Sequence, residues 1–484
     1  MPAPRGGKTR ITGFSFSPER GCGVAELDIV ERAYSLNSNS YTEDEKNIQF
    51  YEGTRKLQNL GLSVPPELHM FETFLNWGRV AVDWIENRQD VRTILSPDSD
   101  TSDPALMEHW DSNNLEAEIS LFNRDKLVFG RSFLCVGANE DDPDHPLITV
   151  ESPREMQMKV DPRRRRAEYA VRFYGETESP AGVTNAEYAT VYLPDSTAWL
   201  ERTIGGKWTV VERDDHRLGR VPVVMSLNRR RTGVWTGETE LTDISPLIVA
   251  GTRTMTALQW AQEVMAVPRR GVLGASKGDF VDPNTNQPLD TWKLYSGAVW
   301  ALANKDAKTF QFDAASLDNF HDTIRLYAQQ ASTVTGIPVK AFGQHTANPA
   351  AEGAVRAEEN DGVKRVERQN ADSGTAIGWA MSIAERLRTG EWMNGNRVKV
   401  EWHDPATPTF AQRADALQKL HGGGAIISRE GAWDELGWSE ARKARERAYF
   451  DAEMSDPYLD RLGMKERDAS TGSAGLPPGA DEGA

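Results

Sequence analysis

Helical spacing of apolar residues dominates the first quarter of the chain. Apolar positions recur three or four residues apart from about residue 25 to residue 126, and Thr42 is a candidate N-cap within this stretch. The segment 65–88 opens on two prolines, which are favoured in the first turn of a helix, and keeps the same spacing. A further apolar stripe covers residues 115–130. Several helices are therefore predicted before residue 130.

The pattern changes at residue 131 to short runs of β-branched and aromatic residues. Gly, Pro, Asn and Asp separate these runs, as is typical of turns between antiparallel strands. The runs are SFLCVG, LITVES, MQMKVD, AEYAVRFYG, ATVYLPD, TAWLERT, KWTVVER and RVPVVMSL. The segment is therefore predicted to form a substantial antiparallel sheet region.

Two long helices of matched length, on either side of a β-rich insert, are predicted next. Ser245 and Pro246 start the first helix, which runs to Pro268 and spans roughly 33 Å at about 1.5 Å per residue. The second covers residues 317–337, roughly 30 Å. Short strand patterns fill the segment between them. Two interpretations stay open: a rod-like helical hairpin with a small β tip, and an ordinary α+β domain with a β excursion.

A third long helix follows the loop KAFGQHTANPA and is unusually polar. It is predicted from the N-cap Asn348 to about Arg388, with an i,i+4 pair between Glu352 and Arg356. Because its middle carries few large apolar residues, we expect it to lie across another subunit or between domains, not in its own core. A strand RVKVEWHD and two or three short helices over residues 408–466 complete the folded chain.

Composition indicates a folded protein of a reducing compartment. Of the 484 residues 39% are apolar, and 56 Lys and Arg against 72 Asp and Glu give a net charge of −16. This acidity argues against tight binding of nucleic acid, which depends on Lys and Arg. The two cysteines, Cys22 and Cys135, are too few for a disulfide framework, and the sequence predicts neither a membrane-spanning segment nor a signal peptide.

Signatures of catalysis or metal binding are incomplete. The chain lacks a GxxxxGK[ST] phosphate loop, and its eight histidines occur singly. Three aspartates over residues 98–103 lack the glycine and glutamate of a calcium loop. Asp214, Asp215 and His216 are the best acid–base cluster, although their sequence predicts a polar turn, and Cys135 is predicted to be buried. We therefore predict no catalytic residue, no metal and no cofactor.

Three arginine clusters interrupt the acidic balance. Those at 163–166 and 229–231 follow turns or strands, so solvated loops are predicted there. Arg269 and Arg270 lie where the first long helix meets the β-rich insert. For this last cluster a partner-binding surface and a plain solvated loop are equally open.

Seven segments, taken in order, resemble a known family. They are FYEGTRKLQNLGLSVPPEL, NWGRVAVDWIENRQDV, WDSNNLEAEISLFNRDKLVFGRSFLCVG, ITVESPREMQMKVDPRRRRAEYAVRFYG, LGRVPVV, ALQWAQEVMAVPRRGVLGA and FGQHTANPAAEGAVRAEE. These segments, and the succession of helix, β-rich insert, helix, loop and long polar helix, resemble the portal proteins of tailed bacteriophages, the head-to-tail connector rings of long-tailed phages. The resemblance covers about residues 40–465 and depends on the number and order of the segments.

The resemblance implies an α+β portal fold with a wing, a helical stem, a small β-rich clip and a C-terminal helical crown. The implied parts are a flexible N-terminal tail (1–24), the wing, helical and then β-rich (25–244), the first stem helix (245–267), the clip (268–316), the second stem helix (317–337), the tunnel loop (338–352), a long helix and strand returning through the wing (353–406), the crown helices (407–466) and a flexible C-terminal tail (467–484).

The resemblance also implies a structural virion protein, not an enzyme, that is assembled in the host cytoplasm at the capsid portal vertex. About twelve copies would form a ring channel for packaging and ejection of double-stranded DNA, in non-specific contact and without a membrane. The implied protein partners are the major capsid protein, the terminase large subunit and the head-to-tail adaptor. The tunnel-loop residues implied to face DNA are Lys340, Gln344, His345, Thr346 and Asn348. The clip residues implied to contact terminase or adaptor are Arg269, Arg270, Lys277 and Asp279.

Two alternatives to a portal stay open. One is another phage head component, such as a minor head or shell protein, which has no reason to carry two long helices around a β tip. The other is a metal-dependent nuclease or hydrolase whose acids, such as Asp214 and Asp215, converge only in the fold. For a portal we expect a net negative channel wall with isolated basic or amide rings, because a strongly basic bore would hold DNA and stall its movement.

Overall fold

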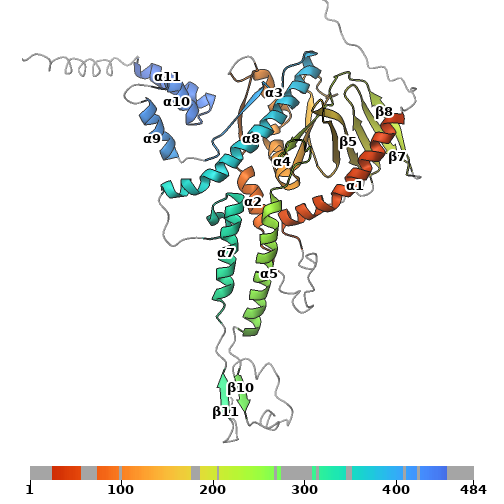
Figure 1. Cartoon of the computed structure of the whole chain (residues 1–484). Coiled ribbons are helices and arrows are strands. Elements are labelled where there is room, and N and C mark those ends of the chain that lie inside the picture. The colour runs from red at the N-terminus through yellow and green to blue at the C-terminus, as the bar shows by residue number, and fades with distance from the viewer. Residues whose placement is uncertain are drawn as a thin grey trace, which may run out of the picture. The chain divides into compact units, whose positions relative to one another are not determined.

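The computed structural model describes residues 24–55, 73–97, 101–175, 186–203, 206–265, 270–273, 308–311, 316–344, 352–406, 410–421 and 426–454 (Figure 1). These residues form the predicted α+β fold, in two compact units, Met1–Ala406 and Thr407–Ala484. The predicted tails, residues 1–24 and 467–484, lie outside the described residues apart from Val24.

A five-stranded antiparallel sheet lies against the first helix. Its strands are neighbours in sequence order, and they are β4 (Met156–Asp161), β5 (Arg166–Tyr174), β6 (Tyr188–Tyr192), β7 (Thr197–Arg202) and β8 (Trp208–Asp214). Helix α1 (Val24–Glu52) packs on this sheet, where its Val30 and Ala33 are fully buried in one cluster with Val171 and Phe173 of β5 (Figure 1). Helical spacing in α1 and alternation in β5 thus supply the two faces of one core.

A three-stranded antiparallel sheet has the order β3-β2-β9. Its strands are β2 (Arg131–Gly137), β3 (Leu147–Glu151) and β9 (Val223–Leu227). Arg131 lies opposite Leu227 at one end of β2, and Gly137 lies opposite Leu147 at the other end. Cys135 is buried in a cluster that also includes residues of β4 and β5. All eight strands predicted from residue 131 onward are confirmed.

The two N-terminal helices differ from the prediction. Helix α1 continues through Thr42, so no separate helix starts at that residue. Helix α2 (Trp77–Glu86) begins after Asn76, whose side chain accepts a hydrogen bond from the Arg79 amide at 3.2 Å. The described residues before this cap are therefore not helical, although the sequence pattern predicted a helix there.

Helix α8 (Glu352–Thr389) contributes to a hydrophobic core of the first unit that is separate from the core between α1 and the five-stranded sheet. Its Ile377 and Met381 are buried with residues of α3 (Pro104–Ser112) and α4 (Leu115–Phe129). Strands β1 (Val91–Leu95) and β12 (Lys399–Trp402) pair antiparallel and contribute to the same cluster. The helix at 115–130 and the strand β12 are confirmed, whereas β1 was not predicted.

The prediction that this long helix is too polar for its own core is wrong for its C-terminal half. Gln369, Asn370 and Ser373 are buried in α8, because other elements supply hydrogen-bond partners for them. The Gln89 side chain donates to Asn370 Oδ1 at 3.0 Å, and Lys126 Nζ donates to Ser373 Oγ at 2.6 Å. Polar groups can be buried at little cost when they are bonded in this way.

Helix α5 (Leu241–Met265) begins four residues before the predicted start and keeps Pro246 inside it. Proline has no amide hydrogen, so the Thr242 carbonyl loses its usual partner four residues ahead. The Ser245 hydroxyl donates to that carbonyl instead, at 3.3 Å. The dipeptide that predicted a helix start is therefore accommodated within the second turn.

Helix α7 (Asp318–Thr335) packs side by side with α5 and ends at Gly336, which has a positive φ of 68° (Figure 1). The predicted match in length is wrong, because α5 has 25 residues and α7 has 18. In sequence between them, strands β10 (Arg270–Leu273) and β11 (Lys308–Gln311) pair antiparallel. The predicted arrangement of two paired helices with a β-containing insert is confirmed.

The described residues of the second unit form three helices, in agreement with the two or three short helices predicted there. They are α9 (Phe410–His421), α10 (Arg429–Glu435) and α11 (Glu440–Met454). The Trp433 ring of α10 stacks against Trp438 and against Phe450 of α11, with centroids 5.8 and 5.9 Å apart. Arg447 and Glu430 add an ion pair at 2.7 Å between these two helices. Every helix in the described part of the chain is too short or too polar to cross a bilayer.

Candidate functional site

Helices α5 and α7 share a buried apolar seam and also present apolar residues to solvent. Ile248 of α5 and Ala331 of α7 are fully buried in the seam. Trp260, Leu326 and Val334 on the same two helices are 42%, 51% and 37% exposed. Large apolar residues that remain accessible on paired helices are suited to contacts with further protein.

The loop after α7 is anchored by an aromatic residue. It begins with the 3₁₀ helix η4 (Val339–Phe342), whose Phe342 is buried edge-on against Trp77 with ring centroids 5.8 Å apart. Lys340, 44% exposed, forms an ion pair with Glu359 of α8, with 3.0 Å between Nζ and Oε1. The charge of this lysine is therefore already balanced in part by its own chain.

The structure describes only some of the site residues predicted from sequence. Lys340 and the half-buried Gln344 lie on the loop that precedes α8. His345, Thr346 and Asn348 of the predicted tunnel loop, and Arg269, Lys277 and Asp279 of the predicted clip, lie outside the described residues. Arg270 begins β10, with its Cα opposite that of Gln311 in β11, and its side chain is not among those described.

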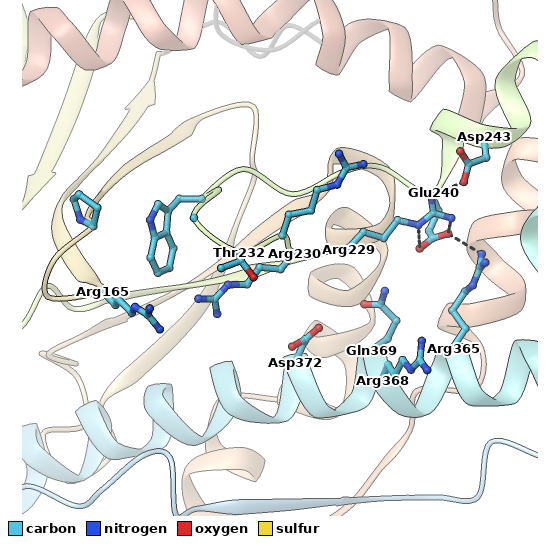
Figure 2. Close-up of a pocket in the computed structure, with 14 residues that line it drawn as sticks. Arg165, Arg229, Arg230, Thr232, Glu240, Asp243, Arg365, Arg368, Gln369 and Asp372 are labelled. Atoms are coloured by element: carbon cyan, nitrogen blue, oxygen red, sulfur yellow. Dashed lines mark hydrogen bonds and ion pairs between the residues drawn. The ribbon is translucent and has the colours of Figure 1, made fainter.

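An arginine pocket of about 860 Å³ lies between α8, the start of α5 and the turns that follow β4 and β9 (Figure 2). Six arginines line it: Arg165, Arg229, Arg230, Arg231, Arg365 and Arg368. Three carboxylates, Glu240, Asp243 and Asp372, line it as well. We refer to this site as the arginine pocket. Its lining carries more positive than negative charge, within a chain that is acidic as a whole.

Glu240 organises one end of the arginine pocket. Its side chain is only 2% exposed and pairs with Arg229 at 2.9 Å and with Arg365 at 3.2 Å. The Asn228 side chain donates to the same carboxylate at 3.1 Å, and Arg229 also reaches Asp243 at 2.6 Å. The prediction of a solvated loop at 229–231 is therefore wrong for Arg229, whose guanidinium is held between two acids. The predicted exposure of residues 163–166 is confirmed.

Lys126 of α4 is fully buried beneath α8. Its Nζ donates to Ser373 Oγ at 2.6 Å and to the Gln369 carbonyl at 3.1 Å. Burial lowers the pKa of Lys126 to about 7, because a charged amine loses its hydration there, although Asp372 and Glu240 favour the charged form. This amine ties α4 to the central helix α8.

Residues of the acid–base cluster at 214–216 are engaged in local contacts. Asp215 pairs with Arg213 at 2.9 Å, and His216 Nδ1 accepts the Leu218 amide at 3.3 Å. Burial lowers the pKa of His216. Cys135 is buried as predicted, and burial raises its pKa to about 12, which disfavours a thiolate nucleophile. Within the described ranges, no group of three His, Cys, Asp or Glu residues is placed to hold a metal ion.

Comparison with known families decides the assignment. The sequence model of the family described as "Phage portal protein, SPP1 Gp6-like" matches residues 37–456. The chain belongs to the phage portal protein family. It is 34% identical over 421 residues to the portal protein of Mycobacterium phage D29, covering 84% of this chain and 85% of that one. It is 33% identical over 429 residues to the portal protein of Mycobacterium phage L5, covering 86% of each.

A solved structure, "Neck of empty GTA particle computed with C6 symmetry", matches with a TM-score of 0.46 and 14% identity. This match covers 80% of this chain and 96% of the other, and similarity at that level carries no argument about function. The family and the two phage relatives give this chain the function of a tailed-phage portal protein. Portal proteins are structural components of the virion, so the predicted family, fold and function are confirmed.

The arginine pocket is a candidate site of this portal protein that the sequence did not predict. Its basic residues come from segments far apart in the chain, since Arg229 and Arg365 meet on Glu240 across more than a hundred residues. The local signal is the run NRRR directly after β9. Three arginines in a loop are expected to be solvent-exposed. Only the tertiary fold brings α8 and Glu240 close enough to pair with them.

Proposed function

We propose that this portal protein assembles as a closed ring of about twelve copies, through which double-stranded DNA is packaged into the capsid and later ejected. The observation that carries the proposal is the family match over residues 37–456, together with the α5–α7 pair that flanks a β-containing insert. We assign α5 and α7 to the stem, the insert to the clip and residues 338–352, which include η4, to the tunnel loop. The second unit, from Thr407, is assigned to the crown.

The exposed apolar residues of the paired helices support a ring. Trp260, Leu326 and Val334 offer apolar area that a neighbouring stem could cover. Covering it removes apolar surface from water and so favours association. In a ring of identical copies, one face of each stem meets a different face of the next, which is a heterologous contact.

Net charge supports passage of DNA without tight binding. At −16 per copy, a ring of about twelve copies carries roughly −190 in total. DNA presents a negative charge about every 1.7 Å of its axis, so a bore dominated by Lys and Arg would retain it. The lysine assigned to the tunnel loop, Lys340, is paired with Glu359, which weakens any contact with phosphate. We propose contacts that form weakly and break as the DNA advances.

The clip residues Arg269, Arg270, Lys277 and Asp279 are proposed to contact the terminase large subunit during packaging and the head-to-tail adaptor afterwards. The wing is proposed to meet the major capsid protein, with assembly in the host cytoplasm. No covalent chemistry is part of this function. An assay for metal-dependent nuclease activity tests that point, since turnover lost in Asp215→Ala would favour an enzyme instead.

Class-average images of the full-length protein test the ring directly. We expect closed rings with a central hole and about twelve repeats. Monomers only, or a shell lattice without a central hole, would reject the portal assembly. Native mass spectrometry of the same sample gives the number of copies in the ring.

Weak contact with DNA is tested at Gln344. Gln344→Lys adds one positive charge per copy to the tunnel loop, and we expect slower packaging at low salt that recovers as salt rises. Gln344→Met, of similar length and without charge, is the control and should package like wild type. Equal packaging rates for Gln344→Lys and wild type at low salt would contradict DNA contact at this loop.

A further inference from the structure

Part of the arginine pocket is only weakly neutralised by its own chain, since the lining carboxylate Asp372 interacts electrostatically with Arg230 but also with the buried Lys126. Arg229 and Arg365 share Glu240, and Arg231 pairs with Glu238 at 2.8 Å. By contrast, three further lining residues form no ion pair with any carboxylate in the described part of the chain. They are Arg165, Arg230 and Arg368.

The guanidinium group of Arg230 lies 4.7 Å from the centre of the Trp235 ring, so the indole holds it in place. Figure 2 shows Arg230 and Arg368 on opposite sides of the pocket, one from the loop after β9 and one from α8. A pocket that presents arginines from two elements is suited to carboxylates, because each guanidinium can donate two parallel hydrogen bonds.

The opposite charge is concentrated in the loop between β2 and β3. We call residues 138–146 the acidic loop, since four of its residues are Glu140, Asp141, Asp142 and Asp144. The Asn139 side chain accepts the amides of Asp141 and Asp142 at 3.1 and 3.3 Å, which fixes the turn. Glu140 and Asp141 are exposed and, among the described residues, form no ion pair.

The lower part of the acidic loop is tied down by His145. Its Nδ1 lies 2.7 Å from Asp142 and its Nε2 lies 3.3 Å from Glu108 of α3. These carboxylates raise the pKa of His145. The loop thus holds Glu140 and Asp141 at its tip on a braced turn instead of a free segment, which reduces the entropy lost on docking.

The two charged features lie at opposite ends of one rigid sheet. Arg131, at the start of β2, is opposite Leu227, and the arginines at 229–231 follow that residue after Asn228. The acidic loop begins after Gly137, at the other end of β2. Seven residues of extended strand separate these ends by about 20 Å. The acidic loop therefore cannot enter the pocket of its own copy without loss of the sheet.

We propose that the acidic loop of one copy docks into the arginine pocket of the next copy around the ring. The proposal rests on the ring described under the proposed function. Complementary surfaces at opposite ends of the same element make a heterologous contact, which closes into a ring when the rotation between copies is right. The chain has an excess of 16 acidic charges, so identical copies present an abundant anionic partner for this cationic pocket.

Charge reversal on each side tests this docking. The pocket variant combines Arg230→Glu with Arg368→Glu, and the loop variant combines Glu140→Lys with Asp141→Lys. We expect the fraction of protein in rings to fall about tenfold or more in each variant alone at low salt, because every interface then carries like charges. Class-average images and native mass spectrometry measure the ring fraction, and thermal melting checks that each variant is folded.

Mixing identifies the contact as one between copies. In an equimolar mixture each reversed pocket can take a reversed loop, and each normal pocket a normal loop, so alternating rings should recover. A chain that carries all four substitutions should recover as well. An intrachain contact would be restored in the four-substitution chain and not in the mixture, and that result overturns the proposal.

The remaining outcomes are also decisive. If the pocket variant alone loses rings and the loop variant does not, the pocket binds another anion, such as DNA or a capsid segment, and the proposal is wrong. Unchanged ring fractions in both variants refute it while leaving the ring intact. A control with Arg32→Glu and Arg217→Glu, two exposed arginines elsewhere, carries the same charge change and should assemble like wild type. Absence of rings in wild type refutes the proposed function itself, and this docking with it.

Discussion

Replacement of Lys126 by methionine should flatten the pH dependence of this portal protein's stability above neutrality. The amine is fully buried and donates to Ser373 and to the Gln369 carbonyl. Methionine has nearly the same length and fits the same space without a charge. The Ser373 hydroxyl keeps a partner in the variant, because it donates to Asn123 Oδ1 at 2.7 Å.

The direction and size of this pH effect on stability follow from the pKa of Lys126, which burial lowers from 10.5 to about 7. Between these two values the unfolded chain binds a proton that the folded chain does not, so stability rises with pH. From pH 7.5 to pH 9.5, this one group adds about 2.5 kcal/mol to the free energy of unfolding. At pH 7.5, Lys126→Met should be at least as stable as wild type, since uncharged replacements of buried charges often stabilise.

Urea unfolding followed by tryptophan fluorescence measures the effect at pH 7.5, 8.5 and 9.5, at a protein concentration below that of ring assembly. Other groups titrate in this range, but they are common to both proteins, so the difference between the two pH slopes isolates Lys126. Lys364→Met, at an exposed α8 lysine, is the control and should keep the wild-type slope. The reasoning is refuted if the free energy of unfolding of Lys126→Met rises between pH 7.5 and pH 9.5 by as much as that of wild type, including the contribution of about 2.5 kcal/mol expected from Lys126.

Three further substitutions probe the packing around the candidate site, each by the shift in urea midpoint. Gly237→Ala should destabilise by about 3 kcal/mol or more, because its Cβ would lie 1.7 Å from the Gly130 carbonyl oxygen; a change below about 1 kcal/mol contradicts this contact. Phe342→Ala removes the ring packed on Trp77 and should cost about 3 to 5 kcal/mol; a loss confined to DNA packaging, with normal stability, would show that the ring does not anchor the loop. Glu240→Ala leaves two arginines without their shared carboxylate and should cost about 3 to 5 kcal/mol, whereas a neutral result would mean that water replaces the acid.

Element types in this portal protein could largely be predicted from the sequence, because they depend on spacing within a few residues. All eight strands from residue 131 to residue 227 follow runs of β-branched and aromatic residues, and α7 ends at Gly336 as its pattern predicts. The residues at which the elements begin and end were predicted less accurately than the element types. Thr42 has the chemistry of an N-cap, yet it lies inside α1, since the helix continues past it and buries Phe50 in a cluster with Trp77 of α2.

Strand β1 escaped prediction because its partner is distant. Val91–Leu95 is short, and its hydrogen bonds come from β12, about three hundred residues later in the chain. No local pattern contains that pairing. Two short segments become a ladder only when α8 and the helices before it bring them together.

The polar character of α8 shows what sequence by itself determined and what only the tertiary structure decided. Composition established the acidity and the two cysteines, motif searches found no complete catalytic signature, and spacing established a long polar helix. The tertiary structure decided which of its polar residues are buried, because other elements supply their partners. Lys126 bonds to Ser373, Gln89 to Asn370 and Asn228 to Gln369. The cost of burying a polar group depends on its partner, and partners are set by the fold. The arginine pocket arose in the same way, since a run of arginines became a paired and half-enclosed site only when Glu240 and α8 met it.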